Sequence, residues 1–122
     1  MDRAGYQSLV VWQRSRALAI EVYRQTQRGL IAREWALRDQ MRRAAVSVPS
    51  NIAEGSARGT HLECAQFLRI AKGSLAELAT QADIAHGIGL LDPEISNQWQ
   101  RECRCLSSML RSLMDHHRRA TL

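Results

Sequence analysis

The chain has 122 residues, of which 45% are hydrophobic and 24% are charged, a balance typical of one globular domain rather than a disordered chain. No run of roughly 18 apolar residues occurs, and the opening MDRAGYQSLVVW lacks a basic stretch before an apolar run, so we expect a soluble, cytoplasmic protein without a leader or membrane segment. The three cysteines are not spaced like a disulfide framework, and we expect them to be small buried hydrophobes: Cys64, Cys103 and Cys105.

The net charge of +5 is unevenly distributed along the chain. Residues 1–58 contain ten arginines and five acidic residues, whereas residues 59–122 contain seven basic and seven acidic residues. Sixteen of the seventeen basic residues are arginine, whose planar guanidinium suits phosphate and carboxylate recognition. Codon usage in a GC-rich genome would produce the same excess, and both explanations stay open.

Two helices are predicted in the first half of the chain. Apolar residues at three- and four-residue steps predict a helix over about residues 8–28, with Gly29 as its stop. A second apolar stripe predicts a helix from about residue 33 to Gly55 or Gly59, and it consists of Leu37, Met41, Ala44, Val48 and Ile52. Because this stripe continues in phase through Pro49, we expect the proline to bend the helix rather than end it.

The second half predicts two further helices. Thr60 and Glu63 have the spacing of a capping box, in which each side chain accepts a hydrogen bond from the backbone of the other, and the helix that starts there ends near residues 86–89. Asp92 followed by Pro93 predicts the start of a fourth helix, which runs to about residue 116. No segment alternates like a strand. The sequence therefore predicts an all-α fold, an antiparallel up-down-up-down four-helix bundle, as one domain over residues 1–122.

The polar residues of the second half predict neither a metal site nor a cofactor. Asp83 and His86 have an i,i+3 spacing, but the Glu-x-x-His pairs of a metal-carboxylate bundle are missing. Cys103 and Cys105 stand two apart on a predicted helix, so their side chains point to nearly opposite sides and cannot chelate one ion.

No catalytic group is predicted either. His61 lies one turn before Cys64, but neither a second base nor an orienting acid is recognisable for a thiol nucleophile. His116 and His117 stand near the end of the last helix, where cations interact favourably with the helix dipole. We therefore expect a protein that is not an enzyme.

A polar stripe runs along one face of the second helix, beside its apolar stripe, and consists of Ser47, Asn51, Glu54 and Arg58. One interpretation is local: Ser47 and Asn51 satisfy backbone groups freed by Pro49, and Glu54 pairs with Arg58. The other is that the stripe faces a neighbouring subunit, where polar groups set the register. The two interpretations are compatible.

Arginines of the first two helices form a candidate phosphate-binding surface. They are Arg14, Arg24, Arg28, Arg38, Arg42 and Arg43. Neither a helix-turn-helix spacing nor an aromatic ladder accompanies them, so sequence-specific readout is not predicted. The leading hypothesis is a non-enzymatic oligomeric bundle that binds RNA or DNA through phosphates. The alternative is a protein-binding scaffold or accessory subunit without nucleic-acid contact, in which the charge keeps the assembly soluble.

The stretches LRDQMRRAAVSVPSNIAEGSAR and FLRIAKGSLAEL, with LVVW before them and GLL after them, resemble a family of four-helix bundles. That family is typified by proteins encoded in bacterial ribosomal-RNA intervening sequences and includes the accessory variability determinant of diversity-generating retroelements. The matching positions are Gln40, Arg43, Ala44, Ser47, Pro49, Asn51, Ile52, Ala53, Glu54, Gly55, Gly73, Ser74, Leu75, Glu77 and Leu78. Where the family has an aromatic-proline pair, this chain has Leu30 and Ile31, so the first turn is expected to differ.

The resemblance implies an antiparallel bundle that assembles into a homopentamer. It also implies, as possible partners, nucleic acid and a reverse transcriptase or another protein, because the accessory determinant binds both. It implies no enzymatic activity. Five copies in a ring would multiply the modest charge of one subunit.

Overall fold

The structure, a computed structural model, describes residues 5–122 and consists of four long helices and two short 3-10 helices. The long helices are α1 (Val10–Thr26), α2 (Trp35–Ala57), α3 (His61–Gly87) and α4 (Pro93–Arg119), and the short ones are η1 (Gly5–Ser8) and η2 (Leu30–Arg33). The predicted all-α four-helix bundle is confirmed, with bounds within about three residues of those expected. The first four residues, on which the expectation of a chain without a leader partly rests, lie outside the described residues.

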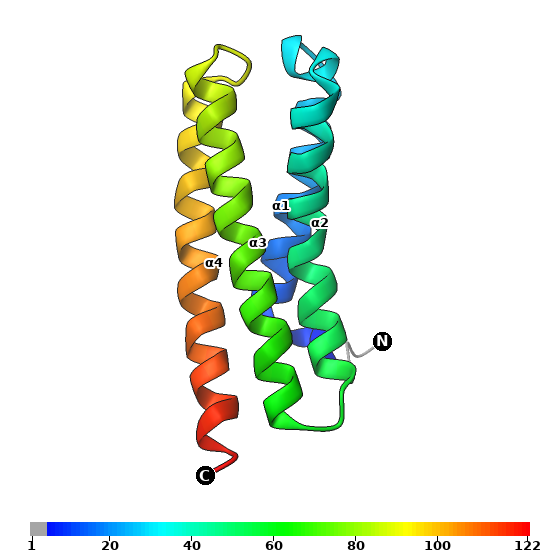
Figure 1. Cartoon of the computed structure of the whole chain (residues 1–122), viewed down its shortest axis with the longest axis vertical. Helices are drawn as coiled ribbons and strands as arrows, with labels where there is room; N and C mark the ends of the chain where they lie inside the picture. The colour runs from blue at the N-terminus through cyan, green and yellow to red at the C-terminus, as the bar shows by residue number, and fades with distance from the viewer. Residues whose placement is uncertain (1–4) are drawn as a thin grey trace.

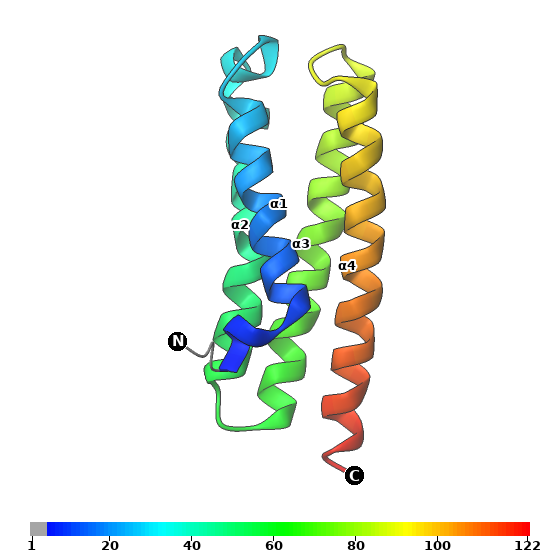
Figure 2. The ribbon, with the colours of Figure 1, turned by 180° about the vertical axis from the view of Figure 1, so that it is seen from behind.

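Successive helices are joined at alternating ends of the bundle (Figure 1). Seen from behind, α1 lies across the pair formed by α2 and α3 and next to α4, so that each helix has neighbours on two sides (Figure 2). Within residues 5–122, no helix combines the length and the apolar character needed to cross a membrane.

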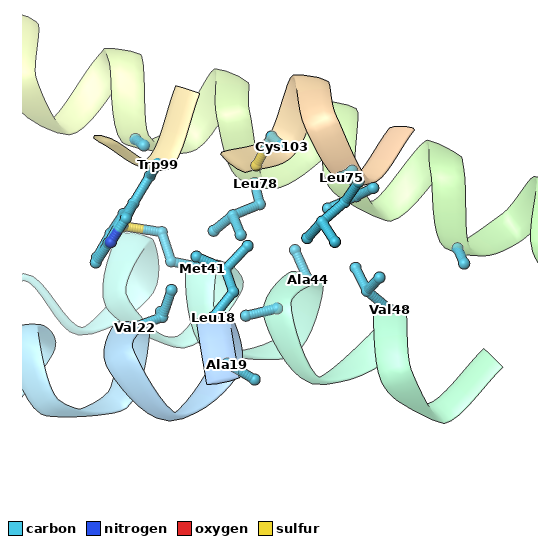
Figure 3. Close-up of a cluster of buried hydrophobic side chains, with 14 of the residues drawn as sticks. Leu18, Ala19, Val22, Met41, Ala44, Val48, Leu75, Leu78, Trp99 and Cys103 are labelled. Atoms are coloured by element: carbon cyan, nitrogen blue, oxygen red, sulfur yellow. The ribbon is translucent and has the colours of Figure 1, made fainter. Parts of the chain in front are cut away.

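The core is formed by the apolar stripes that the sequence predicts. Met41, Val48 and Ile52 of α2 are at most 1% exposed, so the stripe of that helix stays in phase through Pro49, as expected. The close-up shows α1, α2, α3 and α4 all contributing side chains to one cluster, in which Leu78 points toward Met41 and Leu18, and Leu75 toward Ala44 (Figure 3). Burying these side chains contributes about 1.5 to 3 kcal/mol each.

The predicted caps of α3 and α4 are present, one of them in modified form. Thr60 Oγ1 accepts a hydrogen bond from the backbone N–H of Glu63 at 3.1 Å. The carboxylate of Glu63, however, accepts from the hydroxyl of Thr60 at 3.0 Å and not from its backbone, so only one of the two capping-box bonds is made as predicted. At α4, Asp92 accepts from the backbone N–H of Glu94 at 2.8 Å, with Pro93 in the first turn.

The first turn uses its two apolar residues in different ways. Ile31 is 2% exposed and joins the core, whereas Leu30 is 60% exposed. Gly29, with a φ of 74°, lets the chain leave α1 in the left-handed region and enter η2. Of these two residues, only Ile31 therefore anchors the turn to the core.

The expectation that all three cysteines are buried is wrong for one of them. Cys64 and Cys103 are buried, but Cys105 is exposed. Residues two positions apart on an α-helix are separated by about 200° of rotation. Cys105 therefore faces solvent when Cys103 faces the core.

Candidate nucleic-acid interface

Arg14 is the predicted phosphate-binding residue most fully engaged by its own chain. Its guanidinium binds both carboxylate oxygens of Glu102 on α4, and its Nη1 lies 3.8 Å from the Met109 sulfur. This hydrogen bonding to Glu102 raises the pKa of Arg14, which keeps it charged. Arg14 thus joins α1 to α4.

Arg38 and Arg42 also bind residues of their own chain. Arg38 donates to Asp39 Oδ1 and to the Ala32 carbonyl, both at 3.0 Å, and so ties η2 to α2. Arg42 donates to Thr26 Oγ1 at 2.8 Å and lies over the Tyr23 ring, with its central carbon 4.6 Å from the ring centroid. The side chain of Arg42 therefore clamps the end of α1 against α2.

The remaining predicted arginines, Arg24, Arg28 and Arg43, are exposed, and none of their side chains makes a hydrogen bond or ion pair within residues 5–122. Their charges are available to a ligand.

Arg43 lines an open hollow of about 520 Å³ on the α1–α2 surface. The other lining residues are Tyr23, Asp39, Arg42, Val46 and Ser47. This hollow combines a free guanidinium, a guanidinium held on an aromatic ring, and a tyrosine that is 41% exposed. Such a surface can contact a phosphate and present a face for stacking.

Tyr23 was not among the predicted site residues, because the periodicity of α1 places it at the flank of the apolar stripe. The only sequence signal for its role is that flanking position. Its pairing with Arg42 depends on how α1 is rotated against α2, which no local pattern encodes.

The polar stripe of α2 is engaged within the bundle. The hydroxyls of Ser47 and Ser74 on α3 are 2.8 Å apart, and the Asn51 amide donates to the carbonyl and the hydroxyl of Ser47 at 2.8 and 2.9 Å. Arg58 donates to Glu54 at 2.6 Å, which confirms that predicted pair.

One detail of the local interpretation is wrong. Pro49 removes the helical donor for the carbonyl of Ala45, four residues back, whereas the Asn51 amide binds the carbonyl of Ser47. The hydroxyl of Ser47 thus joins α2 to α3, while the Asn51 amide bonds to Ser47 within α2. Their contact with a second subunit stays a prediction.

A histidine and cysteine cluster that the sequence did not reveal lies where α3 begins and α4 ends. His61 and His117 face each other with their Nδ1 atoms 2.8 Å apart, and His117 Nε2 lies 3.4 Å from the Cys64 sulfur. The ring of His116 packs edge-on against His117 at 5.3 Å between centroids. His117 is the second base that the sequence did not reveal, because it is 53 residues from Cys64.

Burial raises the pKa of the Cys64 thiol, and it also lowers the pKa of His117, to which the neighbouring His61 and His116 contribute. Both shifts favour a neutral thiol beside a neutral imidazole, rather than the thiolate that a nucleophile requires. Among residues 5–122, no three histidine, cysteine or acidic side chains are arranged to hold a metal ion. This cluster joins two helix ends.

A family model described as 23S rRNA-intervening sequence protein matches residues 7–112. The fold is similar to that of a crystal structure from Bacteroides thetaiotaomicron, described as a protein with unknown function from the S23 ribosomal protein family. The TM-score is 0.78 at 18% sequence identity, and the match covers 86% of this chain and 98% of that one, so the likeness concerns the fold. No curated protein matches the sequence.

Proposed function

Since this chain belongs to the family of 23S rRNA-intervening sequence proteins, we propose that it is a non-enzymatic, oligomeric bundle that binds RNA or DNA without sequence specificity. The observation that supports this most directly is the α1–α2 hollow, where Arg43 makes no ion pair with any residue that the structure describes and Arg42 lies on the exposed Tyr23 ring. Arg24 and Arg28 supply two further unpaired guanidinium groups from α1 and the loop after it.

Phosphates are the chemistry that this surface suits. An arginine fork binds two phosphate oxygens at once, and unpaired guanidinium groups do so without first breaking an ion pair. The contacts are to the backbone of the nucleic acid, which is the same at every base, so binding tolerates any sequence. Tyr23 adds a stacking face that is equally indifferent to base identity.

Oligomerisation is part of the proposal, with a homopentamer as the expected state. Several copies of the arginine surface in one assembly would raise the effective concentration of cations along one strand. Light scattering is expected to return about five times the 13.8 kDa mass of one chain. A monomer at micromolar concentration would contradict this part of the proposal.

The central experiment measures the binding of a labelled oligonucleotide while salt is raised from about 50 to about 500 mM. The double variant Arg24→Ala/Arg43→Ala removes two unpaired guanidinium groups from the α1–α2 surface. It should weaken binding to every sequence alike and, for duplex DNA, lower the salt slope by roughly two per subunit engaged. These positions are preferred to Arg38, which is held by Asp39 and Ala32.

The matched control is Arg101→Ala/Arg119→Ala on α4, where both arginines are exposed and make no ion pair within residues 5–122. It removes the same net charge from another part of the bundle, so the slope should stay unchanged. An equal loss in both variants would assign binding to net charge rather than to the α1–α2 surface. If the wild type does not bind at low salt, the protein-scaffold alternative is favoured.

A further inference from the structure

An open groove of about 690 Å³ runs between α3 and α4, which lie side by side in both views (Figures 1 and 2). It is larger than the hollow on α1–α2 and lies within the range of about 300 to 1,000 Å³ of ligand pockets. Its walls are formed by residues 69–79 of α3 and residues 100–111 of α4. Gln100 donates to the Ala79 carbonyl at 2.7 Å, which joins the two walls at one end of the groove.

Of the residues that the structure describes, four cationic ones and no acidic one line this groove. Arg69 and Lys72 belong to α3, and Arg104 and Arg111 to α4. None of the four side chains makes a hydrogen bond or ion pair within residues 5–122. Residues 59–122 contain equal numbers of basic and acidic residues, so the fold has separated the two signs that balance along the chain.

The floor of the groove is mostly apolar and is lined by small side chains. Leu75 and Cys103 are buried beneath it, Gly73, Ala76 and Ala79 line the α3 side, and Ser107 and Ser108 line the α4 side. A Cβ atom built on Gly73 would meet nothing within 4 Å, so the groove is open at this point. Small residues at three-residue steps let the backbone of another helix approach closely.

We propose that this groove binds an amphipathic helix of a partner protein, with an apolar stripe flanked by acidic residues. Six residues of α3 line it over the eleven positions 69–79, and at 1.5 Å per residue this span gives the groove a length of roughly 15 Å, or about three helical turns. The apolar stripe of such a helix would cover the small residues of the floor, and its carboxylates would reach the four cations. This inference does not depend on nucleic-acid binding.

The combination of floor and rim distinguishes this occupant from a nucleic acid. Phosphates would pair with the cations and the serine hydroxyls but leave the apolar α3 side of the floor without a matching surface, whereas an amphipathic helix covers that side and also pairs with the cations. On α1–α2 the hollow contains an acidic residue, Asp39, and a stacking ring, Tyr23, and the groove contains neither.

The test uses a fluorescently labelled helical peptide of about 15 residues, with leucines at i, i+3, i+4 and i+7 and glutamates beside them. Two control peptides accompany it: one of the same composition with the leucines scattered around the helix, and one with every glutamate replaced by glutamine. The designed peptide should bind the full-length protein at least about tenfold more tightly than either control.

Two variants of the protein locate the binding. Arg69→Ala/Arg111→Ala removes two rim charges and should weaken peptide binding about tenfold. Gly73→Leu fills the floor, where nothing obstructs a side chain, and should weaken it by at least as much. The control Arg101→Ala/Arg119→Ala removes the same charge outside the groove and should leave binding unchanged. A cooperative thermal transition in each variant establishes that it is folded.

Three results would overturn the proposal. Equal binding of the scattered-leucine peptide would show that charge alone attracts the probe. A labelled oligonucleotide whose binding falls in the groove variants but not in Arg24→Ala/Arg43→Ala would make the groove a phosphate-binding surface. If the wild type is oligomeric and the Gly73→Leu variant is monomeric, a second copy of this chain occupies the groove.

Discussion

In the first half of the chain, three of the six predicted phosphate-binding arginines are held by their own chain: Arg14 by Glu102, Arg38 by Asp39 and Ala32, and Arg42 by Thr26 and Tyr23. In the α3–α4 groove, none of the four cationic side chains makes a hydrogen bond or ion pair within residues 5–122. The half of the sequence with all the net positive charge thus uses much of it internally, while the half with none leaves four cations free around one groove.

This difference shows that the net charge of a segment does not measure the charge it offers to a ligand. An acidic residue on the far side of a helix balances the count but does not neutralise a distant cation, because exposed charges interact weakly beyond about 10 Å at ordinary salt. What counts is whether an acceptor lies within hydrogen-bonding distance. The following predictions test how the two surfaces are built.

The largest expected effect is a difference in stability between substitutions in the floor of the groove and in its rim. Leu75 is 1% exposed and packs in the core, so Leu75→Ala should lower the free energy of unfolding by about 2 to 5 kcal/mol. Arg111, without a partner within the described chain, should tolerate alanine within about 0.5 kcal/mol. Urea denaturation measures both. A loss of several kcal/mol for Arg111→Ala would mean that the rim is structural and not free for a ligand.

A pair of glycines compares the closed α2–α3 seam with the open groove. A Cβ atom on Gly55 would lie 3.0 Å from the Phe67 Cβ and 3.2 Å from the Cys64 carbonyl oxygen. Gly55→Ala should therefore destabilise the protein by about 1 to 2 kcal/mol. Gly73→Ala meets nothing within 4 Å and should stabilise the helix by about 0.5 to 1 kcal/mol. Thermal denaturation of the two variants gives the sign of each change in stability. Stabilisation by both substitutions would show that the α2–α3 contact at Gly55 accommodates a methyl group.

A smaller effect is expected from removing an engaged arginine rather than a free one. The Arg14 and Glu102 side chains are 40% and 28% exposed, so their ion pair is partly screened by solvent. Arg14→Ala should cost no more than about 1 kcal/mol at low salt, and less at about 1 M salt. The control Arg104→Ala, in the groove, should show no salt-dependent cost. Equal salt dependence in the two variants would contradict the distinction between engaged and free cations.

The smallest expected effect is a pH dependence of stability that arises from His117, in the histidine cluster at the end of the bundle. Burial lowers the pKa of His117 below the ordinary imidazole value of about 6.5. The unfolded chain therefore takes up a proton at a higher pH than the folded one. The stability that neutral His117 contributes is complete above about pH 6.5 and is lost as pH falls through its folded pKa.

Urea denaturation at about pH 7.5 and about pH 5.5 measures this dependence. The groups that face His117 are Cys64, His61 and His116, and Arg58 lines the same cavity. His117→Gln should flatten the pH dependence over this range, whereas His86→Gln, at the exposed end of α3, should not. If the wild type loses no more stability than His117→Gln does between the higher and the lower pH, the prediction is wrong.

The sequence by itself determined the elements of this bundle, because the forces that specify a helix act between residues a few positions apart. The stripe of Met41, Val48 and Ile52, the hydroxyl of Thr60 and the Asp92–Pro93 start each act over at most four residues or through a fixed period of 3.6. That is why the bounds of all four helices agree with those expected, and why the local pair of Glu54 and Arg58 was predictable.

Only the tertiary structure decided which charges are free and which polar groups meet. Arg14 and Glu102 are 88 residues apart, and Cys64 and His117 are 53 apart, so their pairing depends on the rotation and register of whole helices against one another. The same packing brings Arg69 and Lys72 of α3 to the groove that Arg104 and Arg111 of α4 line, and leaves no acidic residue there. No local period encodes that arrangement, because it is fixed by contacts between helices in the core rather than by the charged residues themselves.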